Sequence, residues 1–229
     1  MQPQLMPQEK DWEQFWIKDS HKIHGAKPQA ISWSKRRILG ILEKYSAKDK
    51  KALEAGSGSG FFSAYFCDCG MKTTAVDYSD QALGLTQKAT KGRAKTVKAN
   101  LLENPLTSLL SECFDLVFTD GLFEHFSDLE QDRILQNLKS VASPDGVIIT
   151  FVPNRWSPWE LIRPFYMPGI KEVPFRQKQL IELNERNGLK VIEQGGVNTL
   201  PMRFSPDKLL GPTFGMLLYT VSRKSTIST

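Results

Sequence analysis

The segment "LEAGSGSGFF" constrains this chain of 229 residues more than any other. Its glycines Gly56, Gly58 and Gly60 alternate with small residues, directly after the apolar run "KALEA" and directly before two phenylalanines. Glycines at this spacing let the backbone turn sharply and approach a ligand without a Cβ in the way. A flexible linker would not lie between an expected strand and an expected amphipathic helix. We therefore interpret the segment as a ligand-binding turn at the carboxyl end of a strand.

Short strands and helices alternate around this turn. We expect strands at 51–56, 72–78, 94–100, 114–120 and 147–152, and helices at 60–70, 79–92 and 128–146. The strands "FDLVF" and "VIITFV" are apolar on both faces, as in a parallel sheet that is covered by helices on both sides. The pattern predicts an α/β fold with a doubly wound, mainly parallel sheet.

The two ends of the chain depart from this alternation. Two helices are expected before the first strand, one from Asp11 to Gly25 and one within 31–50 with Trp33, Ile38, Leu42 and Tyr45 on its apolar side. After residue 152 the periodicity breaks, and it resumes with a helix at 176–188. Strands at 189–196 and 214–224 follow, which we expect to pair antiparallel at one edge of the sheet. In the helix at 128–146, an apolar stripe is expected at Leu129, Ile134, Leu138 and Val141.

Composition excludes several classes of protein. The longest apolar runs are far shorter than the roughly 20 residues of a membrane-spanning helix, so no membrane insertion is expected. The N-terminus lacks the pattern of a secretory signal, which favours a cytoplasmic location. Cys67 and Cys69 lack further cysteines or histidines at the spacing of a zinc site, so no metal is expected. The basic flanks of the chain are compatible with an acidic partner or RNA, although no nucleic-acid-binding module is recognisable.

The residues around the glycines discriminate between ligand classes. A phosphate-binding loop needs Lys followed by Ser or Thr after its last glycine, and a dinucleotide fold needs a glycine at 61, but Phe61 and Phe62 stand there. The carboxylate of Glu54 would repel a diphosphate and attract an ammonium or sulfonium group. Asp77 ends the next strand, where a carboxylate can accept hydrogen bonds from both ribose hydroxyls. These residues indicate a nucleoside with a positively charged tail.

With these residues the chain resembles the class I S-adenosylmethionine-dependent methyltransferases, of the type that acts mostly on small molecules. "LEAGSGSG" is similar to the first motif of that family, "VDYS" to its ribose-binding acid, and "FDLVFTDGLFEHF" to the motif on its fourth strand. The resemblance implies a Rossmann-like sheet of seven strands, mainly parallel with an antiparallel edge strand. It also implies an N-terminal helical cap at residues 1–45, a methyltransferase domain at 46–229, and a substrate-side insertion or lid at about 153–175.

The resemblance further implies the cofactor, S-adenosylmethionine, with S-adenosylhomocysteine as product. Glu54 would orient the methionine amino end, Asp77 would hold the ribose, and Tyr78 would pack against adenine. Asn100 stands where the family usually has an aspartate facing adenine, and Asp120 would border the reacting methyl group. The expected cofactor-binding residues are Glu54, Gly56, Ser57, Gly58, Gly60, Asp77, Tyr78, Asn100, Leu101, Asp120 and Gly121.

The acceptor side is less defined by the sequence. His125 is a candidate general base, or else a structural hydrogen-bonding group. Aromatic residues near the N-terminus and after the fifth strand lie where the family builds its lid. The expected substrate-binding residues are Trp16, His125, Trp156, Arg163 and Tyr166, which suggest an acidic or aromatic acceptor.

We therefore expect an enzyme that transfers a methyl group from S-adenosylmethionine to an O, N, C or S atom of a small molecule. It would act as a monomer or homodimer, without nucleic acid. The alternatives are an RNA or protein methyltransferase, suggested by the basic flanks, an NAD-dependent oxidoreductase, and a non-catalytic binder of the cofactor.

Overall fold

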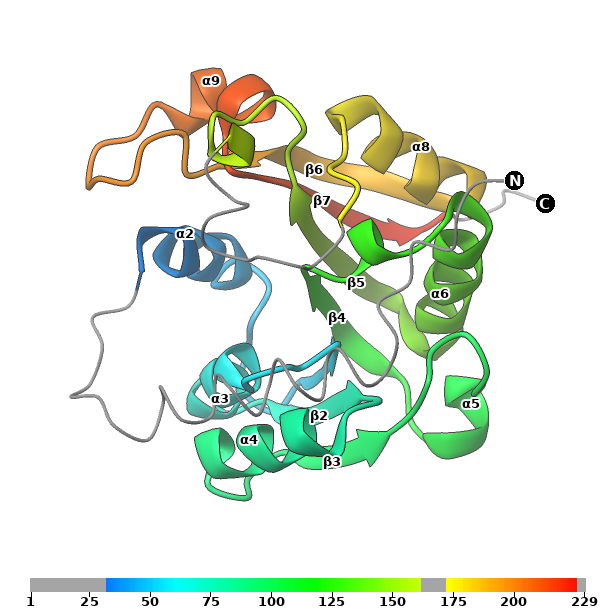
Figure 1. Cartoon of the computed structure of the whole chain (residues 1–229). Helices are drawn as coiled ribbons and strands as arrows, with labels where there is room; N and C mark the ends of the chain where they lie inside the picture. Colours follow the sequence, from blue (N-terminus) through cyan, green and yellow to red (C-terminus); the bar gives the residue numbers. More distant parts are fainter. Residues whose placement is uncertain (1–31, 162–171, 226–229) are drawn as a thin grey trace.

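Seven strands form one sheet in the order β3-β2-β1-β4-β5-β7-β6 (Figure 1). The structure is a computed structural model that describes residues 32–161 and 172–225. The strands are β1 (Lys51–Ala55), β2 (Lys72–Asp77), β3 (Lys95–Lys98), β4 (Phe114–Asp120), β5 (Ala142–Pro153), β6 (Leu189–Val197) and β7 (Leu217–Lys224). The first five are parallel to one another, and β7 runs antiparallel between β5 and the edge strand β6. The predicted α/β architecture is confirmed, including the antiparallel pairing of the last two strands.

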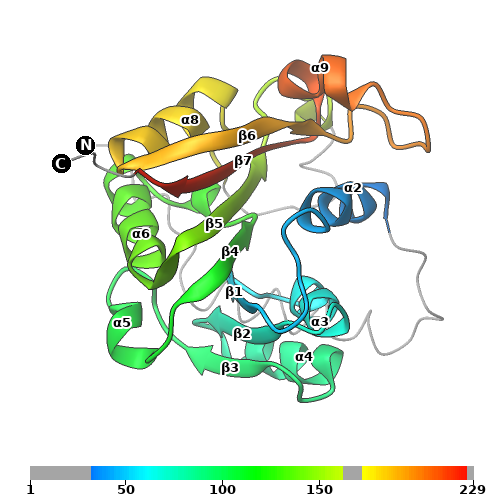
Figure 2. The same cartoon turned by 180° about the vertical axis from the view of Figure 1, so that it is seen from behind.

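Helices cover both faces of this sheet (Figures 1 and 2). The described helices are α2 (Trp33–Leu42), α3 (Phe61–Asp68), α4 (Asp80–Thr90), α5 (Leu106–Leu109), the 3₁₀ turn η1 (Phe123–His125), α6 (Asp128–Val141), α8 (Gln177–Arg186) and α9 (Asp207–Phe214). One apolar cluster joins the sheet to α5, α6 and α8, and a second joins it to α2 and α3. Because both faces are covered, β4 and β5 are buried almost throughout, as their apolar sequences predict. In the described part of the chain no helix combines the length and hydropathy that crossing a bilayer requires.

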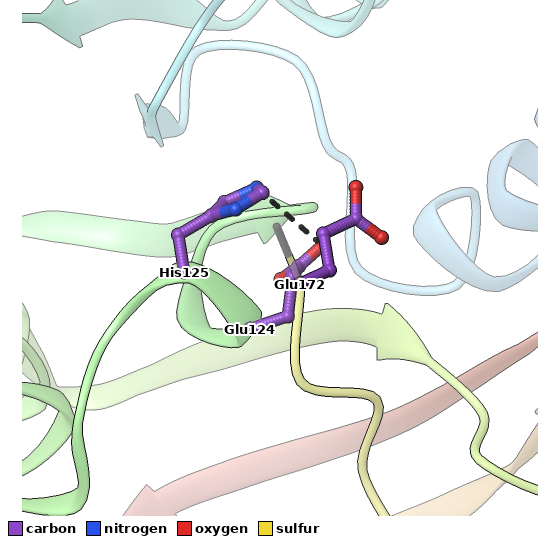
Figure 3. A group of neighbouring side chains, drawn as sticks. All are labelled: Glu124, His125 and Glu172. Atoms are coloured by element: carbon purple, nitrogen blue, oxygen red, sulfur yellow. Dashed lines mark ion pairs between the residues drawn. The ribbon is translucent and has the colours of Figure 1, made fainter. Parts of the chain in front are cut away.

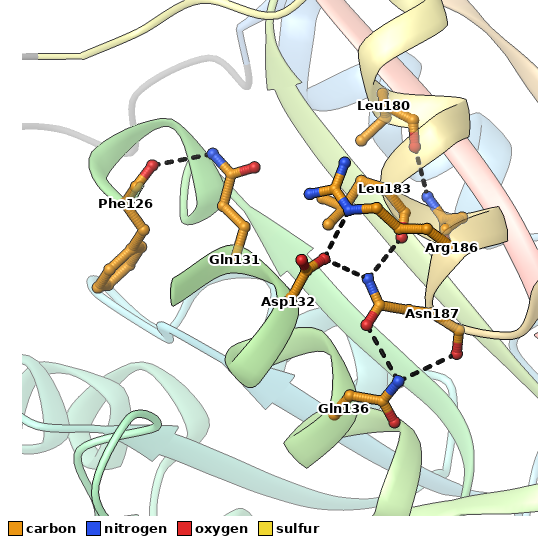
Figure 4. A network of polar contacts seen from close by, with 9 residues as sticks. Phe126, Gln131, Asp132, Gln136, Leu180, Leu183, Arg186 and Asn187 are labelled. Carbon is orange, nitrogen blue, oxygen red and sulfur yellow. Dashed lines mark hydrogen bonds and ion pairs between the residues drawn. The ribbon is translucent and has the colours of Figure 1, made fainter. Parts of the chain in front are cut away.

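A polar network fixes the positions of α6 and α8 (Figure 4). The carboxylate of Asp132 accepts hydrogen bonds from Arg186 at 2.7 Å and from the side chain of Asn187 at 2.6 Å. The residue before Asp132 contacts η1, because the side-chain amide of Gln131 donates to the backbone oxygens of Phe123 at 3.1 Å and Phe126 at 2.9 Å. The turn η1 is thereby tied to a helix that is itself anchored to the sheet.

Three details of the expected helices are wrong. The helix expected at 128–146 ends at Val141, and β5 begins at Ala142. Leu129 was expected in the apolar stripe of α6, but it is 76% exposed, because it lies off the buried face that Ile134, Leu138 and Val141 form. Trp33, expected on the buried side of α2, is 38% exposed, whereas Ile38 and Leu42 are buried as predicted. The helix expected at 11–25 lies outside the described residues.

Gly60 is required by packing between helices. It adopts φ 72° at the N-terminus of α3, and a Cβ there would lie 2.5 Å from the Cα of Thr86 on α4. Gly84, in the middle of α4, has open space around the position of its Cβ.

We expect Gly60→Ala to lower the free energy of unfolding by about 2–4 kcal/mol, because both the backbone conformation and the contact with α4 are strained. Gly84→Ala is the matched control and should raise it by up to about 1 kcal/mol, since alanine is the better helix former. Urea unfolding followed by circular dichroism measures both values. Equal stabilities of the two variants would refute the packing role.

Candidate functional site

One cavity of about 430 Å³ opens at the carboxyl ends of β1, β2 and β4. The sharp turns after these strands bring together residues that lie far apart in the sequence. Ten of the eleven predicted cofactor-binding residues line it: Glu54, Gly56, Ser57, Gly58, Asp77, Tyr78, Asn100, Leu101, Asp120 and Gly121. The cavity continues to η1 and to Trp159 beyond the end of β5. Its size is in the usual range for a small-molecule site, about 300–1,000 Å³.

The glycine loop after β1 is held by hydrogen bonds to the neighbouring strand. The backbone amide of Gly56 donates to the oxygen of Val76 at 2.8 Å, and that of Gly58 donates to the carboxylate of Asp77 at 3.0 Å. The other oxygen of Asp77 accepts from the amide of Ser79 at 3.0 Å. Gly56 and Gly58 adopt φ 73° and φ 48°, in the left-handed region that favours glycine. The loop is therefore formed in advance, with its backbone open toward the cavity.

Two carboxyl groups with perturbed acidity face the cavity. Burial raises the pKa of Glu54 to about 8, although its hydrogen bond from Ser63 opposes this shift. Burial also raises the pKa of Asp120 to about 6, and the nearby ammonium of Lys35 acts in the opposite direction. Burial makes ionisation of both carboxyl groups unfavourable in free energy. A positive charge in the cavity would offset that cost by stabilising the ionised forms. The pair fits the ammonium and sulfonium groups of S-adenosylmethionine.

The adenine end of the predicted site is formed by the turn after β3. The side-chain oxygen of Asn100 accepts a hydrogen bond from the backbone amide of Leu102 at 3.0 Å, and the backbone amide of Asn100 donates to the side-chain oxygen of Asn104 at 2.9 Å. An amide oxygen has a second lone pair, so this bond leaves Asn100 able to accept from an adenine amino group. Leu101 and Tyr78 line the cavity together with Asn100.

The far end of the cavity carries a group of polar side chains (Figure 3). Glu124 and His125 lie on η1, and both are buried. Glu172 comes from a different segment, and one potential ligand atom from each of the three residues lies within 4.8 Å of the others. Two carboxylates and an imidazole can hold a divalent cation, although the sequence led us to expect no metal.

The remaining predicted residues lie elsewhere. Gly60 does not line the cavity, and a Cβ at this residue would point toward Thr86 on α4. Trp156 does not line the cavity either, and its side chain is 57% exposed. Trp16, Arg163 and Tyr166 lie outside the described residues.

Sequence reasoning missed several residues of the cavity wall: Lys35, Glu124, Glu160 and Glu172. Lys35 projects from α2, and Glu160 follows Trp159 in the segment after β5. The pair "EH" at 124–125 was noted for its histidine alone. No local sequence pattern marks Lys35, Glu160 and Glu172 as site residues. They line the same cavity only because separate segments of the chain pack together.

Comparisons with known proteins match the fold of the chain and a domain within it. Residues 53–150, from β1 to β5, match the methyltransferase domain family Methyltransf_11. No match was found among the curated proteins.

Solved structures of similar fold cover almost the whole chain. A putative methyltransferase of Haloferax volcanii in complex with its Trm112 activator has a TM-score of 0.70 at 15% identity, with 96% of this chain and 99% of that chain covered. Magnesium protoporphyrin IX methyltransferase of Synechocystis PCC 6803, with bound S-adenosylhomocysteine, has a TM-score of 0.66 at 13% identity, covering 95% and 98%. The N-methyltransferase NodS of Bradyrhizobium japonicum WM9, in complex with the same product, has a TM-score of 0.65 at 16% identity, also covering 95% and 98%.

Residues 53–150 thus match a methyltransferase domain, and the fold of the chain is shared with solved S-adenosylmethionine-dependent methyltransferases. Two of these solved structures hold S-adenosylhomocysteine, the product of the cofactor that the sequence motifs predict. The resemblance inferred from the sequence motifs is confirmed, as is the predicted enzyme class.

Glu54→Gln separates the functional and structural consequences of the buried carboxyl. A cation favours the ionised form, so we expect the affinity of the wild type for S-adenosylmethionine to rise with pH until the pKa of about 8 is passed. The variant should bind more weakly and lose this dependence. Isothermal titration at several pH values measures it. A wild-type affinity that does not depend on pH would contradict the assignment.

The same variant should be more stable than the wild type in alkaline solution. Because the folded pKa of Glu54 is raised, its stability contribution is fully present below the unfolded value of 4.5 and is lost as pH rises through about 8. Thermal melting should therefore show the difference between wild type and variant growing from about pH 4.5 to about pH 8 and staying constant above that pH. Parallel curves over the whole range would be inconsistent with a buried, perturbed carboxyl.

Asp77→Ala should weaken the binding of S-adenosylhomocysteine by roughly 1–3 kcal/mol, through loss of charge-assisted hydrogen bonds to ribose and to the loop. Asp80→Ala is the matched control, because Asp80 is a nearby acid that pairs with Lys98 at the surface. Isothermal titration should show the control unchanged. If both variants bind like the wild type, Asp77 does not belong to the site.

Proposed function

We propose that the chain transfers the methyl group of S-adenosylmethionine to a nucleophilic atom of a small molecule. The observation that carries this proposal is the continuity of the cavity, which extends from the glycine loop past Asp120 to η1 and Trp159. A cofactor on the loop would leave its methyl group directed toward the second half of the same space. An acceptor of limited size is held there more readily than a folded macromolecule.

The residues of the cavity have distinct roles in this proposal. The backbone at Gly56 and Gly58 lies against the cofactor, Asp77 accepts the ribose hydroxyls, and Glu54 faces the amino end. Asp120 and Gly121, at the end of β4, border the methyl group. When bound, S-adenosylmethionine supplies an electrophilic methyl group on a positively charged sulfur.

Alignment and exclusion of water are the main contributions of the protein to a direct displacement. The rigid ends of β1, β2 and β4 fix the cofactor side. Phe126 and Trp159 give the acceptor side an apolar component that excludes water from the reacting atoms. His125, buried at the same end, can orient the acceptor or take a proton from it.

We further propose that the protein is located in the cytoplasm, as the sequence suggests.

Transfer of radiolabel tests the acceptor class. The full chain is incubated with S-adenosylmethionine that carries a labelled methyl group and with a cell extract, which is then separated by ultrafiltration into small molecules and macromolecules. We expect the label in the small-molecule fraction, and we expect Asp77→Ala to reduce it. Label confined to RNA or protein would replace the small-molecule proposal by the alternative expected from the basic flanks.

A further inference from the structure

Carboxyl groups dominate the charged residues of the cavity. Among the described residues that line it, six carry a carboxyl group: Glu54, Asp77, Asp120, Glu124, Glu160 and Glu172. One, Lys35, carries an amine, which lies 4.2 Å from the centre of the Phe61 ring. Three of the acids belong to the predicted cofactor end, whereas Glu124, Glu160 and Glu172 have no role there. Among the described residues, the acceptor end therefore carries acidic side chains of its own.

Glu124 and Glu172 converge although they lie on different segments (Figure 3). Glu124 is 2% exposed and His125 is 4% exposed, and the imidazole lies 4.0 Å from the Glu124 carboxylate. Glu172 is half-buried and brings a second carboxylate to within 4.8 Å of both. Two carboxylates at such a distance attract a cation that lies between them.

Backbone hydrogen bonds hold Glu172 in this position. The amide of Val173 donates to the backbone oxygen of Glu124 at 2.9 Å, so the segment is attached directly to η1. Two residues further on, the amide of Phe175 donates to the oxygen of Pro153 at 2.9 Å, and its oxygen accepts from Arg155 at 2.9 Å. The carboxylate of Glu172 is thus built into the wall by contacts with the end of β5 and with η1.

Aromatic rings distinguish the kind of cation that suits this wall. Phe126 and Trp159 line the same cavity as the three acids. An organic ammonium group gains from aromatic faces as well as from carboxylates, whereas a small hydrated metal ion gains mainly from oxygen and nitrogen ligands. The combination favours an organic cation.

We propose that the methyl acceptor is an amine, which binds as an ammonium ion between Glu124 and Glu172 and is methylated on nitrogen. This inference rests on the proposed function and names its substrate class. It replaces the acidic acceptor that the sequence suggested through Arg163, a residue outside the described part of the chain.

The reaction of an amine balances at this site. The bound ammonium gives one proton to Glu124 or His125, and the neutral nitrogen then has a free electron pair. That nitrogen bonds to the methyl carbon as the carbon–sulfur bond breaks, and the electron pair of the broken bond remains on sulfur. The products are an N-methylammonium ion and the neutral thioether S-adenosylhomocysteine. The proton held by the protein returns to water when the product leaves.

Binding to the product complex tests the proposal. The full chain is first titrated with S-adenosylhomocysteine and then, when saturated, with three probes of similar size: phenethylamine, phenethyl alcohol and 3-phenylpropionate. We expect phenethylamine to bind at least about tenfold more tightly than the alcohol, and 3-phenylpropionate to bind most weakly. Isothermal titration in the presence of a chelator gives all three affinities.

Matched variants connect this preference to the acids. Glu172→Gln and Glu124→Gln should each lower the affinity for phenethylamine about tenfold while S-adenosylhomocysteine binds as before. Glu185→Gln removes one charge from an exposed position on α8 and should change neither affinity.

The outcomes separate this inference from the proposed function. If the alcohol or the acid binds as tightly as the amine, or if both variants keep the preference for the amine, the inference is overturned while the proposed function stands. Binding of Mg²⁺ alone, lost in Glu172→Gln and without any preference for the amine, would assign the wall to a metal and would also overturn it. Failure of S-adenosylhomocysteine to bind would overturn the proposed function and this inference together.

Discussion

The carboxylate of Asp77 is the interaction on which the cofactor end depends. One of its oxygens accepts from Gly58 in the glycine loop, and the other accepts from Ser79 at the start of α4. It therefore joins the turn after β1 to the turn after β2, across two strands that pair in parallel. Each oxygen has a further lone pair, so the same carboxylate can hold the loop and accept a ribose hydroxyl. Loop geometry and ligand recognition are coupled through one side chain.

The charges of the cavity follow from where these carboxyls lie. Ionising Glu54 or Asp120 in the free protein is unfavourable because both are buried, which is why their pKa values are raised to about 8 and about 6. A cation in the cavity removes part of that cost, since it interacts with the ionised form only. The cavity thus discriminates in favour of a positively charged ligand through the burial of Glu54 and Asp120. The same physical effect distinguishes this loop from those that bind diphosphates.

The cofactor end could be predicted from the sequence, and the acceptor end could not, for a physical reason. Gly56, Gly58 and Asp77 act through backbone geometry and position at strand ends, which local patterns encode. Gly60 belongs to the same pattern but serves the contact with α4, because periodicity alone does not tell which neighbour a missing Cβ accommodates. Glu172 meets Glu124 only because Val173 and Phe175 bond to η1 and to the end of β5. The exposure of Leu129 likewise depends on which face α6 turns toward the sheet.

The two ends of the cavity differ in how freely their chemistry can change. At the cofactor end the backbone itself is the contact surface, so a substitution at Gly58 or Asp77 alters the shape of the loop. At the acceptor end the backbone is fixed independently of the charged side chains. Asn154, fully buried, donates to the oxygens of Thr213 at 3.0 Å and Gly215 at 2.8 Å, and this anchors the segment that carries Trp159 and Glu160. Side chains on such an anchored frame can be exchanged without moving it, so the charge of the acceptor wall is set by residue identity at a few positions. Acceptor selectivity can therefore be altered at Glu124, Glu160 and Glu172 while the cofactor end keeps its geometry.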